Sequence, residues 1–212
     1  MTVLDERPAS ATSQPATASL PTTASLARRA MIDSQLRTSG VNEDFVLAAM
    51  NRVPREDFVP AAARDAAYID RAIPLGDGKF LAAPLVQGRM LAEAAPTVAD
   101  NALLISGGSG YLAELLRPLV GSLEVVEAEA FATRRKKGSF SLLIVDGAIG
   151  ELPDMLAAQL AENGRIVTGL VTRGVTRLAA GRKLAGAVAL LSLAELGIPV
   201  LSEFAAPQRW SF

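Results

Sequence analysis

The stretch Asn101-Ala-Leu-Leu-Ile-Ser-Gly-Gly-Ser-Gly-Tyr111 decides how the rest of the chain is interpreted. Its apolar run has the length of a strand, and glycines break the pattern before leucines resume at helical spacing. This order predicts a strand, a tight turn and a helix. In a doubly wound sheet such a turn is the usual place for a nucleotide-like cofactor, because it brings free N–H groups close to the ligand. A glycine turn alone is equally compatible with a connection that binds nothing, so the surrounding sequence has to decide.

Further strands follow at intervals that favour a parallel sheet. Residues 123–127, 140–146 and 165–171 are predicted strands, and helices expected at 112–116 and 153–160 alternate with them, the second ended by Gly164. Residues 175–178 and 187–194 resemble strands without a long helix between them, which predicts an antiparallel pair at one edge. The strand at 123–127 ends at Glu127, a carboxylate placed either to hold a ribose diol or only to cap the strand end.

Composition limits the chemistry and the partners. The 212 residues include no cysteine and no histidine, which excludes disulfides, thiolate chemistry, histidine-ligated metals and Ser-His-Asp catalysis. The formal net charge is −1, so there is no overall basic field to hold nucleic acid or an anionic membrane. No apolar run reaches the roughly 18 residues of a membrane span. We therefore expect a cytoplasmic protein that binds no metal, nucleic acid or membrane.

The chain divides into three parts by composition. Residues 1–24 are rich in Ala, Ser, Thr and Pro and predict a disordered tail. Residues 25–84 predict a small helical cap that ends in a substrate-loop region, with Ser25 as the expected N-cap of its first helix. Within this part, Pro54 and Pro60 predict an extended connector, and residues 69–80 predict a loop. Residues 85–212 hold the predicted sheet domain.

Several blocks together resemble the protein-L-isoaspartate O-methyltransferase family. Arg52-Val-Pro-Arg-Glu-Asp-Phe-Val-Pro60 is similar to that family's N-terminal signature, and Ala67-Tyr-Ile-Asp-Arg-Ala-Ile-Pro-Leu-Gly76 continues it in register. Residues 105–111 lie where the family has its S-adenosylmethionine loop, and Val125-Val-Glu127 lies where it has a strand ending in a ribose-binding acid. Residues 140–164 resemble a later strand and helix. The likeness extends from about Ala30 to the C-terminus.

The resemblance implies a Rossmann-like α/β methyltransferase fold, S-adenosylmethionine as cofactor, and methyl transfer to the carboxylate of isoaspartyl residues in damaged proteins or peptides, a protein-repair reaction. No strong general base is required, because a carboxylate is already ionised at pH 7 and a sulfonium is a good leaving group. The resemblance assigns cofactor binding to Ser106, Gly107, Gly108, Ser109, Gly110 and Glu127, and the substrate loop to Phe80, Leu81, Ala82, Ala83 and Pro84.

The chain departs from the family pattern at both loops. Where the family's substrate loop reads Thr-Ile-Ser-Gln-Pro, Ala82 and Ala83 replace the serine and the glutamine, so no catalytic residue is assigned. In the cofactor loop the family's first glycine falls at Ser106, and Leu104 replaces the acid two residues before it. We expect a serine to be tolerated at position 106 only if its φ lies outside the left-handed region.

The chain is also shorter than the family between two predicted strands. Only residues 128–139 lie between Glu127 and Phe140, whereas a strand–crossover–strand unit takes roughly 30 residues. Because a crossover of about a dozen residues can just join two parallel strands, we expect one strand to be missing, together with the adenine wall that it carries in the family. The basic run Arg134-Arg-Lys-Lys137 in this stretch predicts a solvated turn or helix face or, alternatively, an anion site.

Two classes of function follow. The first is an active S-adenosylmethionine-dependent carboxyl methyltransferase of the isoaspartyl-repair type. The second is a methyltransferase-fold pseudoenzyme that serves as a binding or scaffolding module. The alanines at 82 and 83 and the missing adenine wall favour the second for turnover. They predict weak or absent cofactor binding, and no rescue of activity by Ala82→Ser alone.

Overall fold

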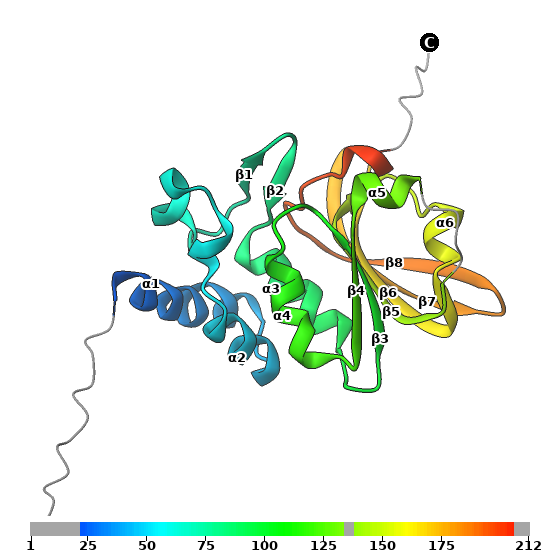
Figure 1. Ribbon diagram of the computed structural model, residues 1–212, viewed down its shortest axis with the longest axis horizontal. Helices are drawn as coiled ribbons and strands as arrows, with labels where there is room; N and C mark the ends of the chain where they lie inside the picture. The colour runs from blue at the N-terminus through cyan, green and yellow to red at the C-terminus, as the bar shows by residue number, and fades with distance from the viewer. Residues whose placement is uncertain (1–21, 134–137, 206–212) are drawn as a thin grey trace, which may run out of the picture.

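The computed structural model describes residues 22–133 and 138–205 (Figure 1). The predicted disorder of residues 1–21 and the two interpretations of the basic run at 134–137 lie outside the described residues. Helix α1 (Thr23–Met31) begins before the expected boundary at residue 25. Thr22 rather than Ser25 is its N-cap, because the Thr22 Oγ1 accepts a hydrogen bond from the Ser25 N–H at 3.2 Å.

The N-terminal cap is helical, as the sequence predicts. Helix α1 continues through a π-helical turn (Ile32–Leu36) and a 3-10 turn (Arg37–Ser39). Gly40 then ends the helical stretch with a φ of 84°, a conformation that glycine adopts without strain. Helix α2 (Asp44–Arg52) completes the cap.

The connection from the cap to the sheet contains more structure than its prolines and glycines suggest. Arg55–Phe58 forms a 3-10 turn led by Pro54, so the expected extended connector is wrong there; the fixed φ of proline suits the start of a turn. A second 3-10 turn, Ala61–Ala66, follows Pro60. The expected loop at 69–80 is also wrong in part, because β1 (Ile73–Gly76) and β2 (Lys79–Leu81) form an antiparallel hairpin. Asp77 and Gly78, at its tip, both have positive φ.

The main sheet has six strands in the order β4-β3-β5-β6-β7-β8. The first four are parallel to one another, β7 pairs antiparallel with β6, and β8 pairs antiparallel with β7. The predicted fold class, a mostly parallel α/β sheet with an antiparallel C-terminal edge, is confirmed. The strands are β3 (Asn101–Ser106), β4 (Ser122–Glu127), β5 (Phe140–Ile149), β6 (Leu160–Thr172), β7 (Val175–Leu184) and β8 (Ala187–Glu195).

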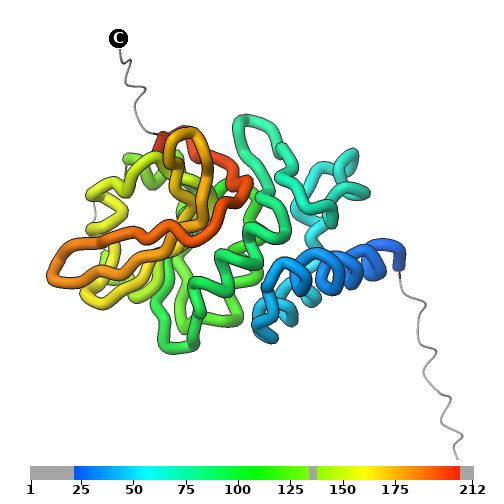
Figure 2. The backbone as a smooth tube through the Cα atoms, turned by 180° about the vertical axis from the view of Figure 1, so that it is seen from behind, coloured from blue at the N-terminus to red at the C-terminus, as the bar shows by residue number. Residues whose placement is uncertain are grey.

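Helices cover both faces of this sheet (Figures 1 and 2). Along β3, Leu104 packs in the cluster that includes α3 and α4, whereas Leu103 and Ile105 pack in the cluster that includes α5 and α6. Successive side chains of a strand point to opposite faces of the sheet. Because both faces are covered here, every position of β3 from Ala102 to Ile105 is apolar, which gives the continuous apolar run in the sequence. The helices are α3 (Pro84–Ala94), α4 (Tyr111–Leu116), α5 (Ala128–Ala132) and α6 (Asp154–Ala157).

The described residues between β4 and β5 contain one short helix, α5, and no strand. Strand β4 is therefore an edge of the sheet, and Val125 on it is 38% exposed. The predicted loss of one strand from the family's sheet is confirmed for this part of the chain.

One predicted helix is shorter than expected. Helix α6 ends at Ala157, and Gly164 lies inside β6 instead of ending a helix. The pairing of β5 with β6 shifts register between Phe140 and Leu142, and a Cβ at Gly164 would lie 2.8 Å from the Phe140 carbonyl oxygen. This glycine therefore serves a β-bulge and a close backbone approach, which its sequence context does not reveal.

An ion pair ties the end of α3 to the sheet. Arg165 on β6 contacts the Asp100 carboxylate at 2.7 and 2.8 Å and donates to the carbonyl oxygens of Ala94 and Ala95 at 2.7 and 2.9 Å. The Arg165 guanidinium holds the pKa of Asp100 well below its usual range. The start of β3, and so the turn at its other end, is thereby fixed against α3.

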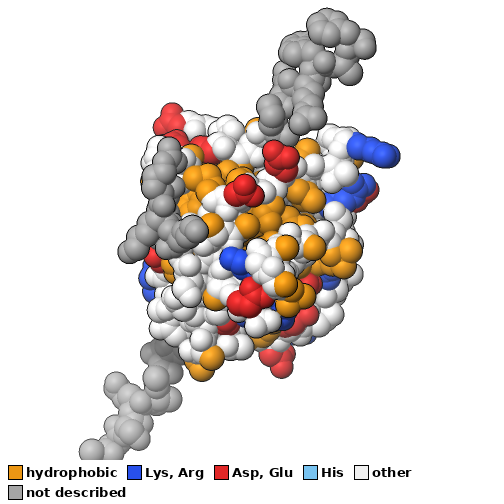
Figure 3. All heavy atoms as spheres, turned by 90° about the vertical axis from the view of Figure 1, so that its right-hand side faces the viewer, with side chains coloured by type: hydrophobic (Ala, Val, Ile, Leu, Met, Phe, Trp, Pro, Cys, Tyr) orange, Lys and Arg blue, Asp and Glu red, His pale blue; other side chains and the backbone are white. Residues whose placement is uncertain are grey.

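The hairpin of β7 and β8 lies at the end of the molecule that faces the viewer in Figure 3, where hydrophobic side chains gather on the surface. Strand β8 is the second edge of the sheet, so one side of its backbone has no partner strand among the described residues. No helix in the described part of the chain is long and apolar enough to cross a membrane. The exposed large hydrophobic residues of the hairpin are Val175, Leu184, Leu191 and Leu193.

Candidate functional site

Two of the predicted site segments meet at the carboxyl ends of β3 and β4. Ser106 is the last residue of β3, and the parallel pairing of the two strands places it beside Glu127, the last residue of β4. The carboxyl ends of parallel strands, at the point where their order reverses, are where doubly wound sheets bind ligands. Here the chain moves outward to β4 and then back to β5, so the two residues lie at such a point.

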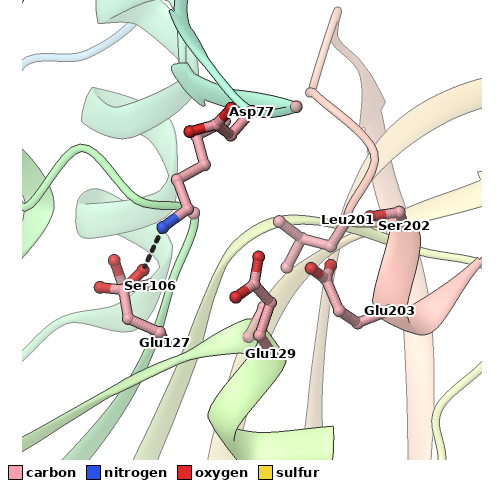
Figure 4. A pocket seen from close by; sticks show the side chains of 11 residues that line it. Asp77, Ser106, Glu127, Glu129, Leu201, Ser202 and Glu203 are labelled. Atoms are coloured by element: carbon pink, nitrogen blue, oxygen red, sulfur yellow. Dashed lines mark ion pairs between the residues drawn. The ribbon is translucent and has the colours of Figure 1, made fainter.

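A pocket opens at this place (Figure 4). Of the predicted cofactor residues, Ser106, Gly107 and Glu127 line it, whereas Gly108, Ser109 and Gly110 do not. Lys79 also lines the pocket and pairs with the Glu127 carboxylate. The other lining residues come from the β1–β2 turn, from α5 and from the C-terminal segment, and are Asp77, Gly78, Ala128, Glu129, Leu201, Ser202 and Glu203.

The glycine turn has the backbone that the sequence predicts. Gly108 and Gly110 have φ of 95° and 73°, and a Cβ at Gly107 would overlap the carbonyl oxygen of Asp146 on β5. Ser106 is absent from the residues with positive φ, so the serine in place of the family's first glycine carries no backbone strain. Its Oγ accepts a hydrogen bond from the Gly108 N–H at 3.0 Å and so helps to close the turn.

Lys79 lies over the glycine turn, a position that the sequence did not suggest. A Cβ at Gly108 would lie 2.5 Å from the Lys79 Cδ, and the Lys79 Nζ lies 3.8 Å from the Glu127 carboxylate, with both side chains nearly half exposed. Phe80 pairs with Gly108 as a parallel bridge. The hairpin therefore covers the turn. The sequence signal that could have located it is Asp77-Gly78, a favoured pair for two-residue hairpin turns.

The predicted substrate loop is placed beside the cofactor turn through this bridge, but its alanines face inward. Ala82 and Ala83 are 3% and 7% exposed, and Leu81 is fully buried. The Ala82 carbonyl oxygen accepts a hydrogen bond from the Arg55 Nη2. Pro84 begins α3. The loop thus offers a fixed backbone and apolar side chains in place of the family's serine and glutamine.

Arg55, from the signature block at 52–60, joins segments that are distant in sequence. It is fully buried, and it donates to the Ala67 carbonyl oxygen at 2.7 Å and to the Gln87 Oε1 at 2.6 Å, as well as to Ala82. Its guanidinium lies 5.1 Å from the centre of the Tyr111 ring at the start of α4. Burial lowers the pKa of Arg55 to about 10, so it remains charged at pH 7. The block therefore positions both loops from inside the core.

A buried carboxyl group, Asp146 on β5, lies behind the glycine turn. Its nearest side-chain donor is the Gln87 Nε2 at 3.5 Å, and burial raises the pKa of Asp146 to about 6. The sequence predicts this residue only as the end of the strand at 140–146. An acid directly after a fully apolar run was the available signal.

The sheet, the glycine turn and the carboxylate at the end of the neighbouring strand place the protein among the Rossmann-like α/β proteins that bind a nucleotide-type cofactor. A model of the protein-L-isoaspartate(D-aspartate) O-methyltransferase family matches residues 27–136. The chain belongs to this family, which confirms the resemblance found in the sequence.

Relatives and solved structures agree with this assignment. The chain is 33% identical over 186 residues to a protein-L-isoaspartate O-methyltransferase of Koribacter versatilis, covering 76% of this chain and 84% of the relative. It is 32% identical over 176 residues to one of Desulfosudis oleivorans, covering 71% and 80%. A crystal structure from Plasmodium falciparum, described as a protein of this type in complex with S-adenosyl-L-homocysteine, matches with a TM-score of 0.68 at 18% identity, over 83% of this chain and 98% of that one. At that identity the structural match supports the fold.

Proposed function

We propose that this protein transfers the methyl group of S-adenosylmethionine to the carboxylate of L-isoaspartyl residues in damaged proteins or peptides. The observation that carries the proposal is the pocket in which Ser106, Gly107 and Glu127 meet at the ends of β3 and β4. Family membership gives the reaction type, and the Plasmodium falciparum structure with S-adenosyl-L-homocysteine supports the cofactor.

The residues of the pocket suit such a cofactor. A carboxylate can accept hydrogen bonds from both hydroxyls of a ribose, and Glu127 presents one beside the glycine turn. The close approach of Gly107 to β5 keeps the turn against the sheet. Lys79, now paired with Glu127, has to yield that carboxylate to the ribose or share it; such an exposed pair contributes little free energy, so the exchange is inexpensive.

Methyl transfer requires mainly that the protein position the methyl donor and the acceptor carboxylate. S-adenosylmethionine, when bound, supplies a methyl group on a sulfonium, and the acceptor carboxylate is already ionised at pH 7. Orientation alone can lower a barrier by roughly 7 to 11 kcal/mol. Arg55 serves this end by fixing the Ala82 backbone and the start of α4 relative to one another.

A second candidate is a protein that binds the cofactor without turnover and acts as a binding or scaffolding module. Ala82 and Ala83 favour it, because neither side chain can donate a hydrogen bond to the substrate. The missing strand gives it less support than the sequence suggested, since α5 and the C-terminal segment supply walls to the pocket.

An assay of methyl transfer to an isoaspartyl peptide distinguishes the two candidate functions. We expect slow incorporation of radiolabelled methyl into an isoaspartyl peptide by the wild type, above a no-enzyme blank. The sequence predicts no rescue by Ala82→Ser alone because of the missing strand. Since α5 and the C-terminal segment line the pocket, we now expect this substitution to raise the rate by about 10- to 100-fold, the size of effect of one hydrogen bond made in the transition state. Ala83→Ser, the same change one residue away, is the control and should not raise it. Incorporation at the level of the blank in all three proteins would favour the second candidate.

Glu127→Ala is expected to weaken binding of S-adenosylmethionine by roughly 10- to 100-fold, because the ribose hydroxyls lose a charged acceptor. Isothermal titration calorimetry measures the dissociation constant directly. Glu151→Ala removes the same charge from an exposed residue after β5 that does not line the pocket, and it should bind as the wild type does. Equal affinities in all three proteins would place the cofactor elsewhere.

A further inference from the structure

The C-terminal segment crosses back over the carboxyl end of β5 and ends in a turn, residues 201–204, which we call the C-terminal turn. Backbone hydrogen bonds hold it there: Leu201 N–H donates to the Ala148 carbonyl oxygen at 2.9 Å, and Gly150 N–H donates to that of Phe204 at 2.8 Å. The Phe204 ring lies 6.1 Å from the ring of Phe131 on α5. The turn is therefore fixed both to the sheet and to the helix that follows β4.

Gly147 in β5 leaves the space in which the C-terminal turn packs. A Cβ at Gly147 would lie 2.5 Å from the Leu201 Cγ, so the leucine side chain occupies the space that a larger residue would fill. Leu201 is 9% exposed, and its remaining surface lines the pocket. This side chain is thus held rigidly at the wall of the pocket by contacts from outside it.

The turn forms the wall of the pocket opposite the glycine turn (Figure 4). Figure 4 shows Glu129 of α5 and Glu203 of the turn reaching into the pocket, with Leu201 beside them and Glu127 on the side of the glycine turn. Glu127 holds the place expected for the ribose carboxylate. The space between it and the turn is therefore where the base of a bound nucleoside would lie.

We propose that the C-terminal turn is the adenine subsite of this protein: Leu201 packs against the purine, and the Glu203 carboxylate accepts a hydrogen bond from the exocyclic amine. The inference rests on the proposed function, because it assumes an adenosyl cofactor in this pocket. A carboxylate accepts from an amine but repels a carbonyl oxygen in the same position. The site therefore selects adenine over hypoxanthine, which carries an oxygen in place of that amine.

The test compares S-adenosylhomocysteine with its deaminated counterpart, S-inosylhomocysteine, by calorimetric titration. The wild type should bind the adenosyl compound at least about 10-fold more tightly. Glu203→Ala should weaken adenosyl binding by about 10-fold or more and leave inosyl binding unchanged or tighter, so that the discrimination disappears. Glu151→Ala, which removes an equal charge from an exposed site outside the pocket, should keep the wild-type discrimination. Glu203 is exposed, so its substitution is compatible with the fold.

The outcomes separate this inference from the proposed function. If the wild type binds both compounds and Glu203→Ala weakens both equally or neither, the adenine subsite is overturned and cofactor binding stands. If the wild type binds neither compound at millimolar concentration, the proposed cofactor site itself is overturned, and the subsite with it. Loss of discrimination in Glu203→Ala with retention in Glu151→Ala supports both.

Discussion

Arg55→Met is expected to lower the free energy of unfolding by about 3 to 5 kcal/mol, because three buried acceptors would lose their hydrogen-bond donor. The methionine can fill much of the volume but donates no hydrogen bond. The carbonyl oxygens of Ala67 and Ala82 and the Gln87 Oε1 would then be left without this donor. Each unsatisfied buried acceptor costs about 1 to 3 kcal/mol.

Chemical denaturation with urea measures this loss. Arg52→Met is the matched control, because Arg52 lies in the same signature block at the exposed end of α2. We expect its effect to stay within about 0.5 kcal/mol. A loss below about 1 kcal/mol for Arg55→Met would contradict the role assigned to the buried guanidinium.

Asp146→Asn is expected to stabilise the protein by about 3 kcal/mol at pH 8 and to have little effect near pH 3. Burial raises the pKa of Asp146 from 3.8 to about 6, and a pKa difference of one between the folded and unfolded states corresponds to about 1.4 kcal/mol. A carboxyl group with a raised pKa contributes fully to stability below its unfolded-state value. That contribution declines between pH 3.8 and about 6, as the unfolded state releases its proton first. Asparagine keeps the shape of the neutral acid and removes this penalty.

Unfolding free energies of the two proteins, measured at intervals from pH 3 to pH 8, test this expectation. The difference should grow between about pH 4 and pH 6 and then level off. Asp65→Asn, an exposed aspartate in the turn after Pro60, is the control and should show no such trend. A difference that stays constant with pH would mean that the Asp146 carboxyl does not change its protonation in this range.

The sequence located the glycine turn correctly because the turn is a local feature. The apolar run of β3, the glycines with positive φ and the acid at the end of β4 all lie within one strand–helix–strand unit. The short connection after Glu127 likewise predicted a missing strand by length alone. The expected loss of the cofactor site did not follow from it, because α5 and the C-terminal segment line the pocket.

Local patterns misjudged several positions whose role depends on distant contacts. Gly164 resembled a helix end, but it is required where β6 passes the Phe140 carbonyl. Ser25 resembled an N-cap, whereas Thr22 three residues earlier accepts its N–H. The sequence around Asp77-Gly78 predicts a loop in place of the hairpin, although the turn residues are favourable, because the strands are only three or four residues long.

The sequence by itself determined the alternation of strands and helices, the antiparallel edge, the glycine turn and the family, since each depends on periodicity or on residues close together in the chain. Only the tertiary structure decided that Arg55 binds the backbone of the substrate loop, that Lys79 covers Gly108, and that Leu201 and Glu203 reach the cofactor pocket. These contacts join segments far apart in sequence. Their partners are fixed by how the chain packs around the sheet, and no local spacing encodes which buried carbonyl or pocket wall a side chain will meet.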